Sequence, residues 1–416
     1  MKHLPRAFLA LCALAWLAAC STARSDSAVA GKAIVGARIY TSPDAVPIDN
    51  GVILVRAGRI ERVGPRDSVS VPAGYEVIDH TGRFVTAGFT NMHVHLTTEV
   101  FLTASERTDD GIRAELERTF TRWGFTTVFD LASTSAIASD VAGRIRSGRV
   151  PGPRVLSVRE PFYPGGGTPV YARPFYEAFG LPSSEILDDA GAAARASRQF
   201  SQGADGIKLF TGAIVGETET RHMQASSVAA LVAVARDAGK PVFAHPTDRQ
   251  GLSLAIDNGV SALAHAAPLM GPWSDNQARH IAQRRVALIP TLSLFEFQPH
   301  PATPTEVAIQ QTSALHRAGG FVLFGTDAGF AEEFDTTTEL RLLERALGWR
   351  GVLASLTTGP ALFLGENHER GRIAPGYLAD LVILTANPAE GAAGMSRVHM
   401  VFREGKVIFP APQTHR

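Results

Sequence analysis

Two histidines one residue apart, His93 and His95, close the largely apolar run 89–95. On a β-strand, residues i and i+2 project from the same face, so one segment can present both imidazoles to a single metal ion. Four further candidate ligands stand at or near the ends of later apolar runs: Lys208, His245, His265 and Asp327. Neutral imidazoles and carboxylates suit zinc and related divalent ions. The ordered series therefore predicts a metal site built by the ends of several strands.

Five segments of the chain carry a resemblance to a known family, and their order and spacing together are specific although no single motif is decisive. They are residues 77–89 leading into the two histidines, Gly124-Phe125-Thr126-Thr127-Val128, the Lys208 run 206–210, Gly325-Thr326-Asp327-Ala328-Gly329, and residues 373–384. From about residue 32 to 408 the chain resembles the amidohydrolase superfamily, and within it the imidazolonepropionase-like and prolidase-like metal-dependent hydrolases.

Lys208 is unusual among the candidates, because a protonated ammonium group cannot bind a cation. The ordinary lysine pKa is about 10.4, but burial beside metal ions would disfavour the charged form. A neutral amine can capture carbon dioxide and become a carbamate, which offers one oxygen to each of two metals. The resemblance supports this prediction, since relatives with a lysine on the fourth strand often carry such a bridge. The alternative is that Lys208 pairs with a buried carboxylate such as Asp130.

The resemblance also implies a role for each ligand around two divalent metal ions, for which zinc is expected. The more buried ion would be held by His93, His95 and Asp327, and the second by His245 and His265, with carboxylated Lys208 and a hydroxide bridging them. Asp327 would take a proton from the hydroxide and return it to the leaving nitrogen, acting as base and acid in turn. His265 is the next candidate for this proton transfer.

Three functions remain open at this stage. The first is a binuclear hydrolase of an amide or peptide C–N bond, such as that of a dipeptide or N-acyl amino acid. The second is a mononuclear hydrolase of a cyclic amide, amidine or lactone, similar to imidazolonepropionase or a deaminase. The third is a non-catalytic binding lipoprotein. The chain has Asn91 where relatives often have aspartate, and the residues after His245 and His265 also depart from the commoner pattern. The resemblance therefore leaves the substrate open.

The elements that must position these residues alternate between strands and helices from residue 87 to 370. Apolar strand candidates end near eight positions: His95, Asp130, Val158, Phe210, His245, His265, Pro290 and Asp327. Helices are predicted over residues 108–123, 188–202, 226–238 and 305–318. Such alternation predicts an α/β fold with a parallel sheet. Eight units favour closure into a (β/α)8 TIM barrel, whose active sites lie at the C-terminal strand ends.

Two further regions complete the predicted organisation. Residues 32–86 and 371–410 contain short strand patterns, including hairpins that turn at Ala57-Gly58 and Glu404-Gly405. We expect these two flanks to form one small β-sandwich beside the barrel. The segment 157–182 has neither helix nor strand periodicity and follows the third barrel strand. It is expected to lie over the mouth of the site, either as a functional loop or as a surface excursion without a role.

The first residues of the chain have the pattern of a bacterial targeting segment. Residues 1–19 combine basic residues with an apolar run too short to span a membrane, which predicts a signal peptide. The sequence Leu17-Ala18-Ala19-Cys20 resembles a lipoprotein cleavage box, and residues 20–31 would form a tether. We therefore expect a lipid on Cys20 and a location in the cell envelope, at the periplasmic or outer-membrane side. The alternative is a soluble periplasmic or secreted protein.

Composition restricts the partners. The 40 basic and 40 acidic residues balance, and no basic stripe indicates nucleic-acid binding. The chain has two cysteines, one inside the predicted signal peptide and one at its cleavage site, which excludes a thiolate metal site in the mature chain. A small amide or peptide substrate is expected, membrane contact only through the lipid, and the sequence is compatible with a homo-oligomer.

Overall fold

The computed structural model describes residues 31–296 and 302–410. The predicted signal peptide, the cleavage box with Cys20 and nearly all of the predicted tether lie outside these residues. Within the described part of the chain, no helix is both long enough and apolar enough to cross a bilayer.

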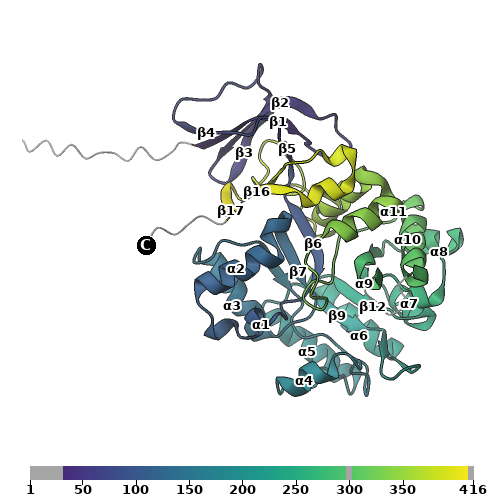
Figure 1. Ribbon diagram of the computed structural model, residues 1–416. Helices are drawn as coiled ribbons and strands as arrows, with labels where there is room; N and C mark the ends of the chain where they lie inside the picture. The colour runs from purple at the N-terminus through teal and green to yellow at the C-terminus, as the bar shows by residue number, and fades with distance from the viewer. Residues whose placement is uncertain (1–30, 297–301, 411–416) are drawn as a thin grey trace, which may run out of the picture.

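The two flanks of the chain build one sheet together (Figure 1). Its N-terminal strands are β1 (Gly31–Ile39), β2 (Ile48–Arg56), β3 (Arg59–Pro65), β4 (Tyr75–Asp79) and β5 (Phe84–Ala87), and its C-terminal strands are β15 (Leu381–Leu384), β16 (Val398–Arg403) and β17 (Lys406–Phe409). The order is β17-β16-β15-β5-β1-β2-β3, with β4 paired to β1, and antiparallel β5–β15 pairing joins the two flanks. The predicted β-sandwich is not confirmed, because all eight strands belong to a single hydrogen-bonded sheet.

Both predicted hairpins are present in this sheet. Strands β2 and β3 turn at Ala57-Gly58, and β16 and β17 turn at Glu404-Gly405. All four of these residues have positive φ, between 49° and 79°. Two-residue hairpins need this left-handed backbone to match the twist of their strands, and glycine adopts it without steric cost.

The middle of the chain forms two parallel sheets surrounded by helices (Figure 1). The first sheet is β6 (Phe89–Val94), β7 (Phe125–Asp130) and β8 (Arg154–Ser157), and the second is β9 (Ile207–Phe210), β12 (Val242–His245), β13 (Ala262–Ala264) and β14 (Ala287–Ile289). A small hairpin, β10 (Gly212–Ile214) and β11 (Thr220–His222), follows β9. The longer helices are α2 (Asp109–Thr119), α3 (Ser135–Arg146), α5 (Asp189–Ser201), α6 (Ala225–Asp237), α7 (Arg249–Asp257), α8 (Asp275–Gln283), α10 (Ala302–Arg317) and α11 (Thr337–Leu356). Shorter helices are α1 (Glu99–Leu102), α4 (Arg173–Ala178), α9 (Leu292–Glu296) and α12 (Thr358–Phe363).

The predicted closed eight-stranded barrel is not formed as one continuous sheet. Seven predicted strands are present and end within one residue of the predicted positions, but the eighth, ending at Asp327, is not a strand. Its segment makes isolated parallel bridges instead, Leu288 with Val322 and Val94 with Ala328, which place it between β14 and β6. Asp327 has φ of 60°, and a left-handed residue cannot continue an extended strand.

Burial of both faces explains why these strands read as continuous apolar runs. All residues of β7, β9, β13 and β14 are buried. One set of side chains packs in an interior cluster that includes Phe129, Phe243 and Leu323, and alternate residues such as Val128 and Leu209 pack among the helices. The interior cluster is an apolar support beneath the strand ends, where the candidate ligands lie.

Candidate metal centre

The six predicted ligands converge at the C-terminal ends of the strands. They are His93 in β6, His95 just beyond it, Lys208 in β9, His245 at the end of β12, His265 directly after β13, and Asp327 in the segment beside β6. Parallel strands bring their carboxyl ends to one edge, so residues spread over 235 positions of sequence become neighbours. The order of the apolar runs predicted this convergence.

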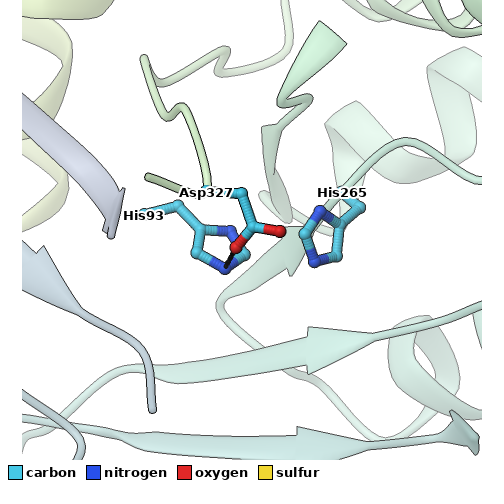
Figure 2. A group of neighbouring side chains, drawn as sticks. All are labelled: His93, His265 and Asp327. Carbon is cyan, nitrogen blue, oxygen red and sulfur yellow. Dashed lines mark ion pairs between the residues drawn. The ribbon is translucent and has the colours of Figure 1, made fainter. Parts of the chain in front are cut away.

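The tightest part of the cluster is His93, His265 and Asp327, whose candidate ligand atoms all lie within 4.8 Å of one another. Figure 2 shows the Asp327 carboxylate between the two imidazole rings. Asp327 Oδ1 lies 3.0 Å from His93 Nε2 and 2.7 Å from His95 Nε2. The resemblance assigned His265 to the second ion and His93 and Asp327 to the first. The structure instead places His265 next to both of these residues.

The orientation of His265 depends on its backbone. The preceding Ala264 packs in the interior cluster, so regular alternation would turn His265 outward toward the helices. Instead His265 has φ of 111°, an uncommon value for a residue with a side chain. Its ring centroid consequently lies 4.5 Å from that of His93 and 4.8 Å from that of His245.

Thr291 fixes which nitrogen of His265 is free. Its hydroxyl lies 2.8 Å from His265 Nδ1 and 2.8 Å from the Pro290 carbonyl oxygen, to which it donates its proton. The hydroxyl therefore accepts a hydrogen bond from Nδ1–H of His265, which leaves the Nε2 lone pair available to a metal. Thr291 is not among the residues predicted from sequence, although its position directly after the predicted strand end at Pro290 was a signal.

Glu339 supports the turn that carries Thr291, and sequence reasoning missed it. This side chain, fully buried in α11, accepts hydrogen bonds from the backbone N–H groups of Leu292 at 3.0 Å and Ser293 at 2.6 Å. Both residues lie in the first turn of α9, where backbone N–H groups have no acceptor within their own helix. A glutamate inside a helical pattern gives no sequence signal for this role.

Two other histidines differ in their partners. The Nδ1–H of His95 donates to the Ala132 carbonyl oxygen at 3.0 Å, which directs its Nε2 toward Asp327. His93 is fully buried, its Nδ1 makes no hydrogen bond among the described residues, and the Asp327 carboxylate 3.0 Å from its Nε2 does not meet hydrogen-bond geometry. A buried imidazole without a well-formed hydrogen bond is costly, and a metal ion shared by Nε2 and the Asp327 carboxylate would satisfy both groups.

Asn91 occupies the position where relatives often have aspartate. Its side-chain oxygen accepts from the His93 backbone N–H at 3.1 Å, and its amide donates to Thr326 Oγ1 at 2.8 Å. It therefore ties β6 to the residue before Asp327. Asn91 therefore positions both the His93 segment and the Asp327 segment, although relatives often have aspartate here.

Lys208 lies within this cluster and is 2% exposed. It makes no ion pair or hydrogen bond with the residues that the structure describes, and its Nζ lies 5.5 Å from the centroid of the Phe210 ring. The alternative partner, Asp130, instead accepts hydrogen bonds from Ser133 Oγ, Ser157 Oγ at 2.6 Å, and the Leu96 N–H at 3.3 Å. The alternative to the carbamate, a Lys208–Asp130 ion pair, is therefore absent.

The electrostatics favour neutral donors around one ionised carboxylate. Burial lowers the pKa of His93 to about 3 and the pKa values of His245 and His265 well below the ordinary value. Burial likewise lowers the pKa of Lys208 to about 7, with the negative charge of Asp327 opposing the shift. Burial alone would raise the pKa of Asp327, but the neighbouring imidazoles hold it well below its usual range. Neutral imidazoles, a neutral amine and a carboxylate are a donor set that fits a divalent metal ion.

Comparisons with known proteins agree with this geometry. A model of the amidohydrolase family matches residues 84–408. A curated relative, the 5-methylthioadenosine/S-adenosylhomocysteine deaminase of Symbiobacterium thermophilum, is 51% identical over 47 residues, which are 11% of this chain and 11% of the relative. The chain thus matches only about a tenth of that relative's length.

Solved structures resemble the chain over nearly its whole length. A Xaa-Pro dipeptidase with methionine bound in its active site has a TM-score of 0.77 at 20% identity, covering 91% of this chain and 99% of that one. Phenylurea hydrolase B has a TM-score of 0.74 at 20% identity, covering 92% and 97%. The ochratoxinase of A. niger has a TM-score of 0.73 at 18% identity, covering 91% and 95%. At these identities the likeness shows the fold alone.

Proposed function

Because this chain belongs to the amidohydrolase family, we propose that it is a binuclear metal-dependent hydrolase of an amide or peptide C–N bond, with a dipeptide or N-acyl amino acid as substrate. The observation that carries the proposal is the state of Lys208. This lysine is buried among the candidate ligands, lacks an ionic partner among the described residues and has a pKa lowered to about 7. A neutral lysine amine can become a carbamate that offers an oxygen to each of two ions, which favours a two-metal site over the single-metal alternative.

In this proposal His93, His95 and Asp327 would hold the first ion and His245 and His265 the second. Carboxylated Lys208 would offer one oxygen to each. Lys208 in its neutral form attacks carbon dioxide through its Nζ lone pair, a C–N bond forms, and one proton is released to solvent. Two divalent ions, with zinc expected, supply an acidified water and polarise the scissile carbonyl when bound.

Asp327 carries the proton in this proposal. Its carboxylate is buried and ionised, so it can accept the proton of the attacking water and then donate it to the leaving nitrogen. Its left-handed backbone, with the Asp327 N–H donating to the His93 carbonyl oxygen at 2.9 Å, holds the carboxylate beside the imidazoles. His265 is the second candidate for this role, because Thr291 leaves its Nε2 unprotonated and facing the cluster.

The proposed location is the cell envelope, with a lipid on Cys20 anchoring the enzyme at the periplasmic or outer-membrane side. This part of the proposal rests on the sequence of residues 1–20 alone. The metal-dependent hydrolase region would extend over residues 87–370, with the flanks 32–86 and 371–410 as its accessory β-domain.

Metal analysis and a substrate screen test the proposed function together. Protein prepared with zinc and bicarbonate should contain close to two metal ions per chain and hydrolyse members of a dipeptide and N-acyl amino acid library. A reproducible content near one ion with full activity on a cyclic amide, amidine or lactone would favour the mononuclear alternative. Stoichiometric metal without turnover of any substrate class would favour a binding protein.

Substitution of Lys208 tests the bridge directly. We expect Lys208→Ala to lose the second ion and activity, and short carboxylic acids to restore part of both by replacing the carbamate. Lys208→Arg should fail as well, since a guanidinium stays protonated and cannot carry carbon dioxide. Near-normal turnover by Lys208→Ala would contradict the proposal.

A further inference from the structure

We propose that Tyr171 and Phe330 form an aromatic rim at the mouth of the metal centre, which contacts the amine half of the substrate and selects amines with apolar or aromatic substituents. The inference rests on the proposed amide hydrolysis and adds a substrate class to it. The two residues are 159 positions apart in the sequence, yet their ring centroids are 5.2 Å apart with an edge-on angle of 69°.

Phe330 is fixed next to Asp327 by a tight turn. The N–H groups of Phe330 and Ala331 both donate to the Asp327 carbonyl oxygen, at 3.1 and 3.2 Å. Gly329 within the turn has φ of 101°, and a Cβ atom there would lie 2.1 Å from the His95 carbonyl oxygen. The turn is therefore packed directly against a candidate ligand segment. The Phe330 side chain remains 48% exposed, so a large apolar surface faces solvent three residues from Asp327.

Tyr171 is carried by a loop that is firmly supported despite its lack of regular structure. The Glu185 carboxylate accepts the backbone N–H groups of Gly166 at 2.9 Å and Thr168 at 3.0 Å, together with the Thr168 hydroxyl at 2.6 Å. The N–H of Val170 donates to the Ile214 carbonyl oxygen at 2.9 Å, which anchors the loop on the β10–β11 hairpin. These contacts anchor the loop up to the residue that precedes Tyr171.

Tyr171 lies close enough to the centre for the charge of Asp327 to act on its phenol. Burial of the phenol and the negative charge of Asp327 raise the pKa of Tyr171, although the residue as a whole is 38% exposed. Its hydroxyl has no hydrogen-bond partner among the described residues. Tyr171 therefore combines a largely desolvated phenol with a ring that remains partly accessible beside Phe330.

The position of the rim relative to Asp327 identifies the substrate half. Asp327 must come within hydrogen-bond reach of the leaving nitrogen to protonate it. The substituent on that nitrogen then extends past Asp327 toward the Phe330 turn and Tyr171. Apolar surface placed there leaves water and contacts two rings, so an apolar or aromatic amine is favoured over a small or charged one.

A substrate pair that shares one acyl half tests the proposal, with phenylalanine or glycine as the amine half. We expect Tyr171→Ala and Phe330→Ala each to lower kcat/KM for the phenylalanine substrate about 10- to 100-fold, mainly through KM, the range of apolar discrimination in such pockets. The glycine substrate should change less than about threefold. Tyr171→Phe keeps the ring and should keep the preference for phenylalanine.

Leu362→Ala provides a matched control. Leu362 is 47% exposed, close to the value for Phe330, and lies in α12. Its neighbours Ala361 and Leu364 line a small cavity with Gly88 and Thr126, at the opposite ends of the strands. Neither substrate should respond to this change.

Binding of free phenylalanine to the metal-loaded enzyme separates the rim from the proposed function, because binding needs no turnover. The wild type should bind phenylalanine at least tenfold more tightly than Tyr171→Ala does, and more tightly than it binds glycine. The proposed rim would be contradicted if kcat/KM fell equally for both substrates or did not change in either alanine variant. It would also be contradicted if the wild type did not prefer free phenylalanine to glycine. Failure of the proposed function would instead appear as retained phenylalanine binding without hydrolysis of any amide.

Discussion

Replacement of Lys208 by methionine should stabilise the metal-free protein, by an amount that depends on pH in a defined way. The lysine is 2% exposed without an ionic partner among the described residues, and burial lowers its pKa from 10.5 to about 7. At about 1.36 kcal/mol per pH unit, this difference corresponds to roughly 5 kcal/mol of unfavourable free energy in the folded state. Relaxation around the charge reduces that value, so we expect a measured difference of about 2–5 kcal/mol.

The direction of the pH dependence follows from proton linkage. Between pH 7 and about 10.5 the unfolded chain holds the Lys208 proton and the folded chain does not, so wild-type stability rises with pH across this window. Below pH 7 both states are protonated and the full penalty is present. The advantage of Lys208→Met should therefore be greatest and constant below pH 7, and shrink by about 1.4 kcal/mol per pH unit above it. The buried histidines His93, His245 and His265 have lowered pKa values and are neutral throughout.

Urea unfolding measures the difference in unfolding free energy between Lys208→Met and wild type. The protein is treated with a chelator and kept in buffer free of carbon dioxide, and the measurement is repeated at intervals from pH 6 to 9.5. Lys240→Met is the control, because Lys240 is partly exposed and lies 3.7 Å from Asp205, so its substitution should not stabilise the protein. A stability difference between Lys208→Met and wild type that does not vary between pH 7 and 9.5 would refute the reasoning. So would a variant less stable than wild type below pH 7, since Lys208 would then have a partner that stabilises its charge.

Three further outcomes are expected. Asp327→Asn should keep at least one metal ion while kcat falls about 10²- to 10⁴-fold and KM changes less. A variant that retains both ions and more than about a tenth of the wild-type kcat would make Asp327 a ligand only, with His265 next to test. Thr291→Val removes the acceptor for His265 Nδ1–H, so metal affinity in a buffered zinc titration should weaken about 10- to 100-fold, whereas Thr291→Ser should stay near wild type; equal affinities would show that the hydroxyl does not orient the ring. Cys20→Ser should move the protein from the membrane to the soluble fraction, and an intact mass without a diacyl or triacyl addition on the wild type would exclude lipidation.

Sequence pattern was sufficient for the local elements and for the set of candidate ligands. A strand buried on both faces must be a short apolar run, and a polar residue that ends it is visible without coordinates. The same holds for the hairpins at Ala57-Gly58 and Glu404-Gly405, because left-handed turn positions restrict the residue type. These are short-range effects, and they fixed seven strand ends to within one residue.

The sheet arrangement was less visible in the sequence. The prediction of an eighth strand was wrong because Asp327 has a left-handed backbone. That conformation depends on hydrogen bonds from residues 326 and 327 to the His93 carbonyl oxygen in β6, and residues adjacent in sequence do not reveal it. The flanks were expected to form a sandwich, but strand pairing joined them into one sheet. Pairing between segments some 300 residues apart is decided by packing of the whole chain, for which a local pattern carries no information.

The succession of polar residues after apolar runs identifies the groups that converge at the strand ends, and their order. Their chemical state depends on tertiary packing. His265 turns inward through its φ of 111° and its bond to Thr291, and Asp130 accepts from two serines instead of pairing with Lys208. Tyr171 reaches Phe330 only through the folded loop. Orientation, protonation and partnership depend on distances of a few ångströms and on exclusion of water, which long-range packing sets and residue order does not.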